Sequence, residues 1–144
     1  MTDGHDQSLE RVAQDFATSV SRVLRRLRTE TKTELALSQM SVLARLEQDG
    51  PTNTADLARA ELMKPQSMGI ILGSLEQEGL VERRPHPTDR RQILFALTDA
   101  GAAVRTRHRA LKRDWLLGAL ARLDPAQRDA LVAAIPVIRR IGES

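Results

Sequence analysis

Hydrophobic positions along the middle of the chain recur with two different periods. One stripe at the i, i+3, i+4 and i+7 spacing of a helix consists of Met68, Ile71, Leu72 and Leu75. Residues 81–84 and 93–97 alternate instead between apolar and polar positions, as β-strands do. The change of period predicts a helix followed by a two-stranded hairpin.

Local signals predict where this helix begins and ends, and a second helix before it. Pro65 is favoured at the first helical position because its missing N–H has no partner there. Gly79 can adopt the left-handed conformation that ends a helix. We expect Thr54 to cap the earlier helix, and Leu62 and Met63 to fill the space between the two helices.

Further amphipathic helices flank this segment on both sides. Apolar residues recur every three or four positions over residues 9–27. We expect Ser38 to cap the next helix and Thr98 to cap a long helix after the hairpin. Asp124 begins the last helix, and Gln127 is placed to complete its capping box.

The predicted fold is mainly α with a small β-hairpin wing: a winged helix-turn-helix with N- and C-terminal dimerisation helices. We expect an N-terminal dimerisation helix in residues 1–34, a winged helix-turn-helix DNA-binding domain in 35–98 and C-terminal dimerisation helices in 99–144. A short strand at 52–53 is expected beside the hairpin. The N- and C-terminal helices carry more apolar surface than one chain can bury, so a two-fold homodimer is predicted. The alternative is that these helices pack on the winged unit of their own chain.

Composition narrows the classes of function. The chain has 144 residues, a net charge of +3 and no cysteine, which excludes a disulfide framework, a thiolate zinc site and a cysteine redox switch. No apolar run is long enough to span a bilayer and no signal peptide is present, so we expect a cytoplasmic protein with no membrane partner. With 2% aromatic residues, stacking on unpaired bases is disfavoured and duplex DNA is favoured.

The outward face of the helix at 65–77 suits the major groove. Its candidate DNA-binding residues are Lys64, Gln66, Ser67, Ile70 and Ser74. Gln66 can contact adenine through two hydrogen bonds, Ser67 can reach a base edge or a phosphate, and Ile70 can pack on a thymine methyl group. Gly69 and Gly73 each cost about 1 kcal/mol in a helix relative to alanine. The glycines are explained if DNA or a neighbouring helix approaches the backbone closely at these positions. The alternative is that the helix merely tolerates them.

The hairpin carries a basic tip. Its candidate DNA-binding residues are Arg83, Arg84, Asp89, Arg90 and Arg91. A narrow minor groove attracts arginine, so we expect Arg90 and Arg91 to enter it or to contact phosphates beside it. We expect Asp89 to pair with Arg91 and fix the direction of its side chain. One of Arg83 and Arg84 is expected only to cover the sheet with its stem.

Nothing in the chain has the spacing of a catalytic or metal site. His5, His86 and His108 lie far apart in the sequence, and no glycine-rich phosphate loop is present. We therefore expect neither an enzyme nor a metal or cofactor. The alternative to DNA binding is a winged-helix protein–protein interaction module without DNA specificity.

The hairpin also carries a recognisable signature. Asp89-Arg90-Arg91, followed by Leu97-Thr98 and Gly101, resembles the Asp-x-Arg … Leu-Thr-x-x-Gly pattern of the MarR family of transcriptional regulators. Residues 39–46, 56–58, 65–75 and 79–83 also match that family in order and spacing, so that the resemblance covers nearly the whole chain. It implies a homodimer with triangular two-domain subunits on a pseudo-palindromic operator. It also implies release of the DNA by a small ligand, often phenolic or another anionic aromatic compound, and hence a repressor.

The resemblance also implies where such a ligand would bind and where this chain departs from the family. The family's pocket lies where the dimerisation helices meet the winged domain. By position the candidates are Phe16, Arg25, Met40 and Trp115, for each of which plain core or surface is the alternative. Lys64 stands where the family often has serine or threonine, and Gly69, Ile70, Gly73 and Ser74 stand where arginine or threonine is frequent.

Overall fold

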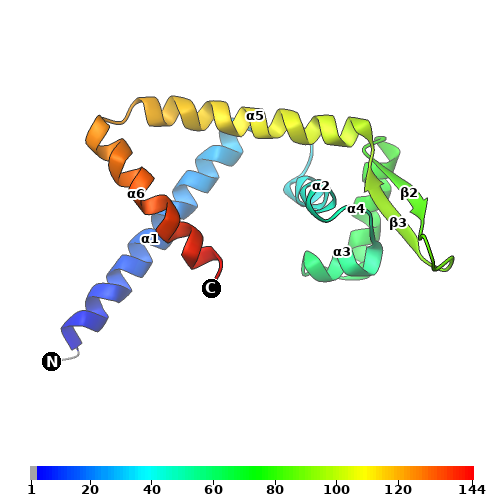
Figure 1. Ribbon diagram of the computed structural model, residues 1–144, viewed down its shortest axis with the longest axis horizontal. Helices are drawn as coiled ribbons and strands as arrows, with labels where there is room; N and C mark the ends of the chain where they lie inside the picture. The colour runs from blue at the N-terminus through cyan, green and yellow to red at the C-terminus, as the bar shows by residue number, and fades with distance from the viewer. Residues whose placement is uncertain (1–2) are drawn as a thin grey trace. The chain divides into compact units, whose positions relative to one another are not determined.

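The computed structural model describes residues 3–144, and side chains from residue 8 onward. The helices are α1 (Asp3–Glu30), α2 (Leu37–Asp49), α3 (Thr54–Ala60), α4 (Pro65–Gln77), α5 (Asp99–Ala121) and α6 (Pro125–Gly142), and the strands are β1 (Thr52–Asn53), β2 (Val81–Pro85) and β3 (Ile93–Leu97) (Figure 1). The chain divides into two compact units, residues 33–110 and residues 1–32 with 111–144. The predicted fold class, mainly helical with a hairpin wing, is confirmed.

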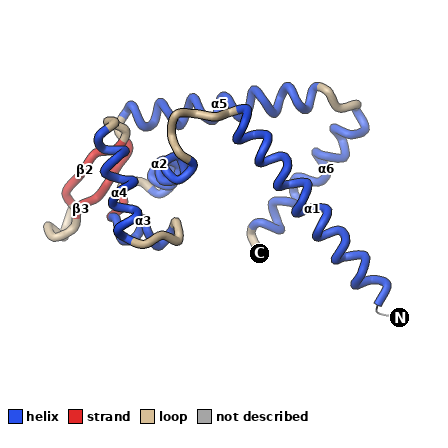
Figure 2. The backbone as a smooth tube through the Cα atoms, turned by 180° about the vertical axis from the view of Figure 1, so that it is seen from behind, coloured by secondary structure: helices blue, strands red, loops and turns tan. Residues whose placement is uncertain are grey.

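The sheet of the unit formed by residues 33–110 has the strand order β1-β3-β2 and is antiparallel throughout. The hairpin pairs Val81 with Leu97 at one end and Pro85 with Ile93 at the other. Thr52 pairs with Phe95, so the predicted short strand beside the hairpin is confirmed. Figure 2 shows the loop that joins β2 and β3 projecting beyond the strands.

The core of this unit lies where α2, α3 and α4 pack against one another and against the sheet. Of the predicted stripe, Met68, Leu72 and Leu75 are at most 1% exposed, and Ile71 packs partly buried against the same cluster. The remaining buried members of the cluster are Met40, Val42, Leu43, Leu46, Leu57, Ala58, Leu80, Val81 and Phe95. The spacing of the apolar residues therefore predicted correctly which face of α4 packs into the core.

Two of the predicted helix caps are wrong. Asn53 caps α3 instead of Thr54: its side-chain oxygen accepts the backbone N–H of Asp56 at 2.8 Å. α2 begins at Leu37, before the predicted cap Ser38, and the Gln39 side chain accepts the N–H of Ala36 at 2.9 Å. At both helix starts a neighbouring side chain forms the hydrogen bond in place of the predicted cap. α2 therefore begins one residue before its predicted cap, and α3 begins at the residue that was predicted to cap it.

The turn between α3 and α4 contradicts half of another prediction. Met63 packs partly buried against the core, as expected. Leu62 does not fill the space between the helices: it is 95% exposed and has a left-handed φ of 54°. The turn needs this conformation so that the backbone N–H of Met63 can reach the carbonyl of Ala58, and this directs the Leu62 side chain into solvent.

A backbone contact joins the end of α4 to the beginning of α5. Gly79 has the expected positive φ, 74°, and the next carbonyl, that of Leu80, accepts the N–H of Thr98 at 3.1 Å. The Thr98 hydroxyl donates to the Gly79 carbonyl at 2.6 Å and accepts the N–H of Gly101 at 3.1 Å, so its predicted capping role is confirmed. A Cβ at Gly101 would lie 2.1 Å from the Leu80 oxygen. The Leu-Thr-x-x-Gly pattern therefore describes one close backbone crossing.

The first half of α5 packs with the winged unit. Val104 contacts the core cluster. Glu47 of α2 forms ion pairs with two arginines of α5, with Arg105 at 3.6 Å and with Arg109. This compact unit runs as far as Ala110, whereas the predicted DNA-binding domain ends at residue 98.

The second unit consists of α1, the last part of α5, and α6. The predicted capping box begins α6: Asp124 accepts the N–H of Gln127 at 2.8 Å, and the Gln127 side chain accepts the N–H of Asp124 at 3.1 Å. No described residue of α1 or α6 is buried. The exposed apolar side chains of these two helices are Leu9, Val12, Val23, Leu24, Leu131, Val132, Ile135, Val137, Ile138 and Ile141. None of the helices in the described part of the chain is long and apolar enough to cross a membrane.

We predict that Gly101→Ala destabilises the winged unit strongly. The new methyl group would collide with the Leu80 carbonyl, which cannot move without losing its hydrogen bond from Thr98. We expect the free energy of unfolding to fall by about 3 kcal/mol, measured by urea denaturation at fixed protein concentration. Gly118→Ala, in the same helix but facing open space, is the matched control and should be neutral or stabilising by up to about 1 kcal/mol. Equal effects of the two substitutions would contradict the crossing.

Candidate nucleic-acid interface

The face of α4 that points away from the core is exposed and uncharged. Pro65 is the first helical residue, and Lys64 before it provides no side-chain cap and is exposed. Gln66 and Ser67 are exposed, and Ile70 is 75% exposed. These four predicted site residues, Lys64, Gln66, Ser67 and Ile70, are thus all accessible to a partner.

Ser74 differs from the other predicted residues of this face. It is half-buried, and its hydroxyl accepts a hydrogen bond from the Gln39 amide of α2 at 3.1 Å. The contact ties α4 to α2. Ser74 therefore has a role within the fold that its helical position did not reveal.

The two glycines of α4 face open space. A Cβ built at Gly69 or at Gly73 would meet no atom within 4 Å. Close packing of a neighbouring helix is therefore not the reason for either glycine in this unit. Of the explanations given by the sequence, close approach of DNA and simple tolerance remain.

The arginines at the base of the wing already have acidic partners. Arg83 Nε lies 2.9 Å from Glu76 Oε2, and its guanidinium lies 5.3 Å from the centre of the Phe95 ring. Arg84 pairs with Glu82 on the same strand at 2.8 Å. Arg83 is thus the arginine that covers the sheet, as expected of one of the two.

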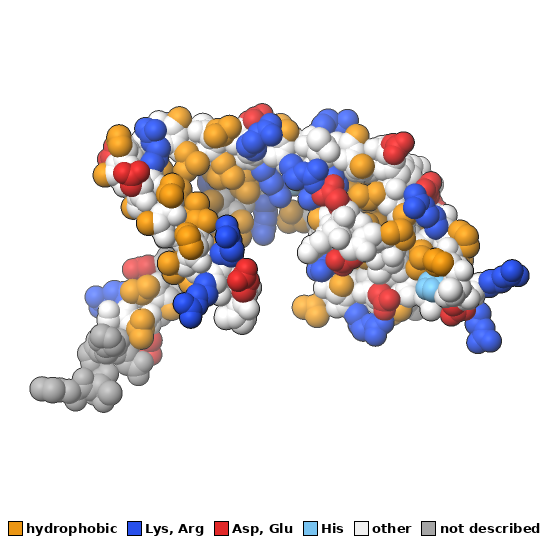
Figure 3. Space-filling model, in the orientation of Figure 1, with side chains coloured by type: hydrophobic (Ala, Val, Ile, Leu, Met, Phe, Trp, Pro, Cys, Tyr) orange, Lys and Arg blue, Asp and Glu red, His pale blue; other side chains and the backbone are white. Residues whose placement is uncertain are grey.

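The arginines at the tip of the wing are arranged differently. Arg90 and Arg91 are exposed, and within the described part of the chain neither takes part in an ion pair. Figure 3 shows basic side chains projecting from the end of the hairpin, clear of the rest of that face. Of the four wing arginines, these two present their whole charge to a partner.

Asp89 orders the loop through the backbone. The expected ion pair with the Arg91 side chain is wrong: Asp89 Oδ1 accepts the backbone N–H of Arg91 at 3.0 Å. Its other oxygen accepts the side-chain amide of Gln92 at 3.2 Å. Asp89 is half-buried beneath the tip, so it shapes the loop that carries the arginines without binding either guanidinium group.

Three further residues, which the sequence did not mark as functional, complete this loop. His86 Nδ1 accepts the backbone N–H of Asp89 at 2.9 Å and that of Thr88 at 3.2 Å. Gln92 Oε1 accepts a hydrogen bond from Asn53 Nδ2 at 2.9 Å, and Asn53 also caps α3. The network runs from the wing loop to the start of α3. Of the three residues, only His86 stood out in the sequence, as an isolated histidine. Nothing in the sequence indicated that the amide side chains of Asn53 and Gln92 would meet.

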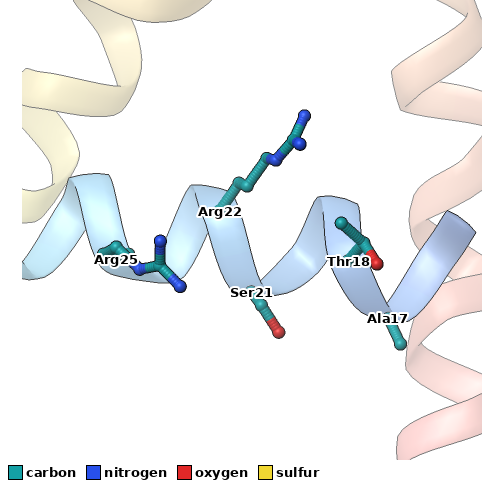
Figure 4. A pocket seen from close by; sticks show the side chains of 5 residues that line it. All are labelled: Ala17, Thr18, Ser21, Arg22 and Arg25. Atoms are coloured by element: carbon teal, nitrogen blue, oxygen red, sulfur yellow. The ribbon is translucent and has the colours of Figure 1, made fainter. Parts of the chain in front are cut away.

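The candidate ligand residues fall in both units. Met40 is a buried core residue of the winged unit, 6% exposed. Phe16 and Trp115 are half-buried in the other unit, and Arg25 is exposed there. Arg25 lines an open hollow of about 460 Å³ with Ala17, Thr18, Ser21 and Arg22 (Figure 4). All five lining residues belong to α1, so the hollow offers two guanidinium groups and two hydroxyls but no wall from another element.

No group of acidic, histidine or cysteine side chains suited to a metal ion occurs among the residues that the structure describes. His86 belongs to the wing loop, and His108 is half-buried on α5. The side chain of His5 lies outside the described residues.

Comparison with known proteins decides the family. The family model for MarR matches residues 35–93, which include the helix-turn-helix and the wing up to the first residue of β3. An HTH-type transcriptional regulator of Mycobacterium bovis is 36% identical over 125 residues, 86% of this chain and 87% of its own length. The chain belongs to the MarR family. MarR proteins are DNA-binding transcriptional regulators and not enzymes. This protein is therefore a DNA-binding transcriptional regulator.

Two other MarR-type relatives extend the comparison. An HTH-type transcriptional repressor of Mycobacterium tuberculosis is 34% identical over 96 residues, covering 66% of this chain and 69% of its own. A solved transcriptional regulator of Pseudomonas aeruginosa has 30% identity and a TM-score of 0.85, with 96% and 97% of the two chains covered. The resemblance to the MarR family inferred from the hairpin signature is therefore confirmed over nearly the whole chain.

We predict that Asp89→Ala leaves the Arg91 amide unprotected, whereas Asp89→Asn, which loses only the contact with the Gln92 amide, keeps it protected. Alanine removes the acceptor of the Arg91 N–H, and asparagine retains a carbonyl oxygen in its place. Losing one such hydrogen bond should speed amide hydrogen exchange at Arg91 about fivefold. Exchange followed by NMR on both variants measures this, with the amides of α2 as an internal reference. An Arg91 amide that exchanges in Asp89→Ala as slowly as in the wild type would contradict the role assigned to the Asp89 side chain.

Proposed function

We propose that this MarR-family protein is a homodimeric repressor that binds a pseudo-palindromic operator and is released by a small ligand. In this proposal α4 enters the major groove with Lys64, Gln66, Ser67, Ile70 and Ser74 on its DNA side. The wing tip, with Arg90 and Arg91, contacts phosphates or the adjacent minor groove. The observation that carries the proposal is this pair of arginines, which have no ion-pair partner among the described residues, on a loop ordered by Asp89 and His86.

The same proposal assigns lesser roles to the other wing residues. Arg83 and Arg84 have acidic partners at 2.9 and 2.8 Å, so they add less positive charge to the DNA surface. Asp89 acts by holding the loop. We assign residues 35–98 to DNA binding, and residues 1–34 and 99–144 to dimerisation, with the first turns of α5 also bracing the winged unit.

The homodimer is proposed from the uncovered apolar side chains of the terminal helices. Ile135, Ile138 and Ile141 are 45%, 40% and 53% exposed on one face of α6, and Leu9 and Val12 are 62% and 59% exposed on α1. Large exposed apolar surfaces on a protein generally mark an interaction site. A second copy related by a two-fold axis is the economical partner, and it would present two copies of α4 to two inverted half-sites.

Repression and release by a ligand are proposed on the strength of the family. The relative from Mycobacterium tuberculosis is named a repressor, and MarR regulators bind small-molecule effectors. For an anionic aromatic ligand this chain offers Arg25 beside Arg22 in the hollow on α1, with Phe16, Met40 and Trp115 as further candidates. The ligand is thus proposed as a class only.

We predict that Arg90→Ala/Arg91→Ala weakens binding to every duplex alike. Neutralising a phosphate releases counterions, so the slope of log affinity against log salt should become shallower by about 0.9 for each phosphate that the variant no longer neutralises. Fluorescence anisotropy at several salt concentrations measures this slope, with an operator that the wild-type protein has selected from a random duplex pool and with a scrambled duplex. The control Arg90→Lys/Arg91→Lys keeps the charge and should keep most of the slope. An alanine variant with an unchanged slope would show that the wing tip does not contact phosphates.

We predict that the protein sediments at twice the 16.0 kDa of the chain. Ile138→Asp would place a charge in the apolar stripe of α6 and should shift sedimentation equilibrium toward the monomer, because an unpaired charge is costly at an apolar interface. Ala133→Asp introduces the same charge on the opposite side of this helix and should leave the dimer intact. A wild-type monomer at micromolar concentration would overturn this part of the proposal.

A further inference from the structure

The exposed face of α4 lacks the side chains that most often read guanine. No residue from Pro65 to Leu75 is charged, whereas arginine or lysine bound to guanine is the commonest specific contact in the major groove. What this face offers instead is Gln66, which can pair with adenine, and Ile70, which can contact a thymine methyl group. The chemistry available on the helix thus favours A·T base pairs.

Ile70 projects from the helix without protein neighbours beside it. It is 75% exposed, and its neighbours on this face, Gly69 and Gly73, have open space where a side chain would be. Alanine at either glycine would fit the protein and would favour the helix by about 1 kcal/mol. The glycines are therefore not required by the fold. Both lie on the same side of Ile70 around the helix, where they let a flat surface approach the backbone beside the Ile70 side chain.

Leu62 provides a second exposed apolar group beside the beginning of α4. It is 95% exposed and, among the described residues, the only one other than glycine with positive φ. A left-handed conformation costs a leucine about 1–2 kcal/mol, which glycine avoids and asparagine reduces. Since the side chain contributes nothing to the core, this strained and solvated leucine calls for a role outside the fold.

We propose that Ile70 packs on a thymine methyl group in the major groove and that the operator half-site is read at A·T base pairs. Leu62 makes a second apolar contact on the DNA next to the N-terminus of α4, and Gln66 reads an adenine in the same half-site. The proposal rests on the insertion of α4 into the groove proposed above. The two roles are separate: the arginines of the wing supply affinity for any duplex, and the uncharged outward face of α4 supplies the choice of sequence.

The first experiment removes single methyl groups from the DNA. The wild-type protein selects an operator from a random duplex pool, and each thymine is then replaced in turn by deoxyuridine, which lacks only the 5-methyl group. At one thymine of each half-site we expect the affinity to fall about fourfold, which corresponds to one buried methyl group. At thymines outside the α4 footprint the affinity should not change.

The second experiment removes the protein side of the same contact. Ile70→Ala should bind the thymine operator at least about fourfold more weakly per half-site and should no longer distinguish uracil from thymine at that position. Ile70→Val keeps a methyl contact and should retain the uracil effect. Leu37→Ala removes another exposed leucine, 63% exposed on α2, and should bind DNA as the wild type does.

Variants with opposite effects on folding and binding separate a DNA role from a structural one. Leu62→Gly and Gly73→Ala should each raise the midpoint of thermal unfolding, the first by relieving the left-handed leucine and the second by favouring the helix. Both should nevertheless weaken operator binding, the first because the leucine side chain no longer packs on the DNA and the second because the new methyl group meets the DNA. Unchanged binding by both variants would overturn the assigned approach of the DNA.

The outcomes distinguish this inference from the proposed function. A symmetric operator whose thymines all tolerate uracil, or whose α4 footprint selects only G·C pairs, would overturn the inference and leave the DNA-binding dimer standing. Failure to select any symmetric duplex would overturn the proposed function itself. A uracil effect that disappears in Ile70→Ala supports both.

Discussion

The carbonyl oxygen of Leu80 is the point on which the geometry of the winged unit depends. It accepts the N–H of Thr98, and the α-carbon of Gly101 lies so close that no side chain fits between them. Gly79 and Leu80 join α4 to β2, and Thr98 to Gly101 join β3 to α5, so one crossing relates four elements. The position of the wing relative to α4 is therefore set by backbone atoms, and the side chains of both remain available to a partner.

The electrostatics of this unit leave the two arginines at the tip of the wing without an ion-pair partner among the described residues. Acidic neighbours pair with Arg83 and Arg84 at the base of the wing, and the single carboxylate of Glu47 is shared by Arg105 and Arg109 of α5. With a net charge of only +3, the chain has little long-range attraction for DNA as a whole. In the proposed complex with DNA, local presentation by Arg90 and Arg91 then matters more than total charge, and the hydrogen bonds of the wing loop hold the backbone that carries them.

Hydrophobic periodicity and helix-capping residues predicted the helices and strands, because both reflect forces that act over a few neighbouring positions. The stripe of α4, the hairpin, the Thr98 cap and the capping box at Asp124 all follow from local rules. The cap of α3 did not, because Asn53 and Thr54 can both accept an N–H, and the pairing of Asn53 with Leu94 decides between them. That choice depends on a strand about forty residues away along the chain.

The candidate site was predictable in position and less so in detail. Spacing identified which residues of α4 point outward, but not that Ser74 accepts from Gln39, a residue from another helix. Charge alone indicated an Asp89–Arg91 ion pair, whereas the loop turns so that the carboxylate reaches the backbone N–H instead. Leu62 was assigned to the core from its apolarity, and only the φ demanded by the turn directs it outward. The last two errors arise where loop conformation overrides residue type, and the first arises where two helices meet.

The terminal helices raise a question of stability that the winged unit does not. α1 is 28 residues long without a buried residue among those described, and α6 has none either. Helices without tertiary packing are marginal in water, so these two need an apolar surface that the described chain does not supply. In the proposed dimer that surface belongs to the second subunit, and folding of the arms and association become one equilibrium. Their stability would then depend on protein concentration, and the proposed ligand, if it binds among these helices, would act on the same equilibrium that holds the two copies of α4 at the proposed half-sites.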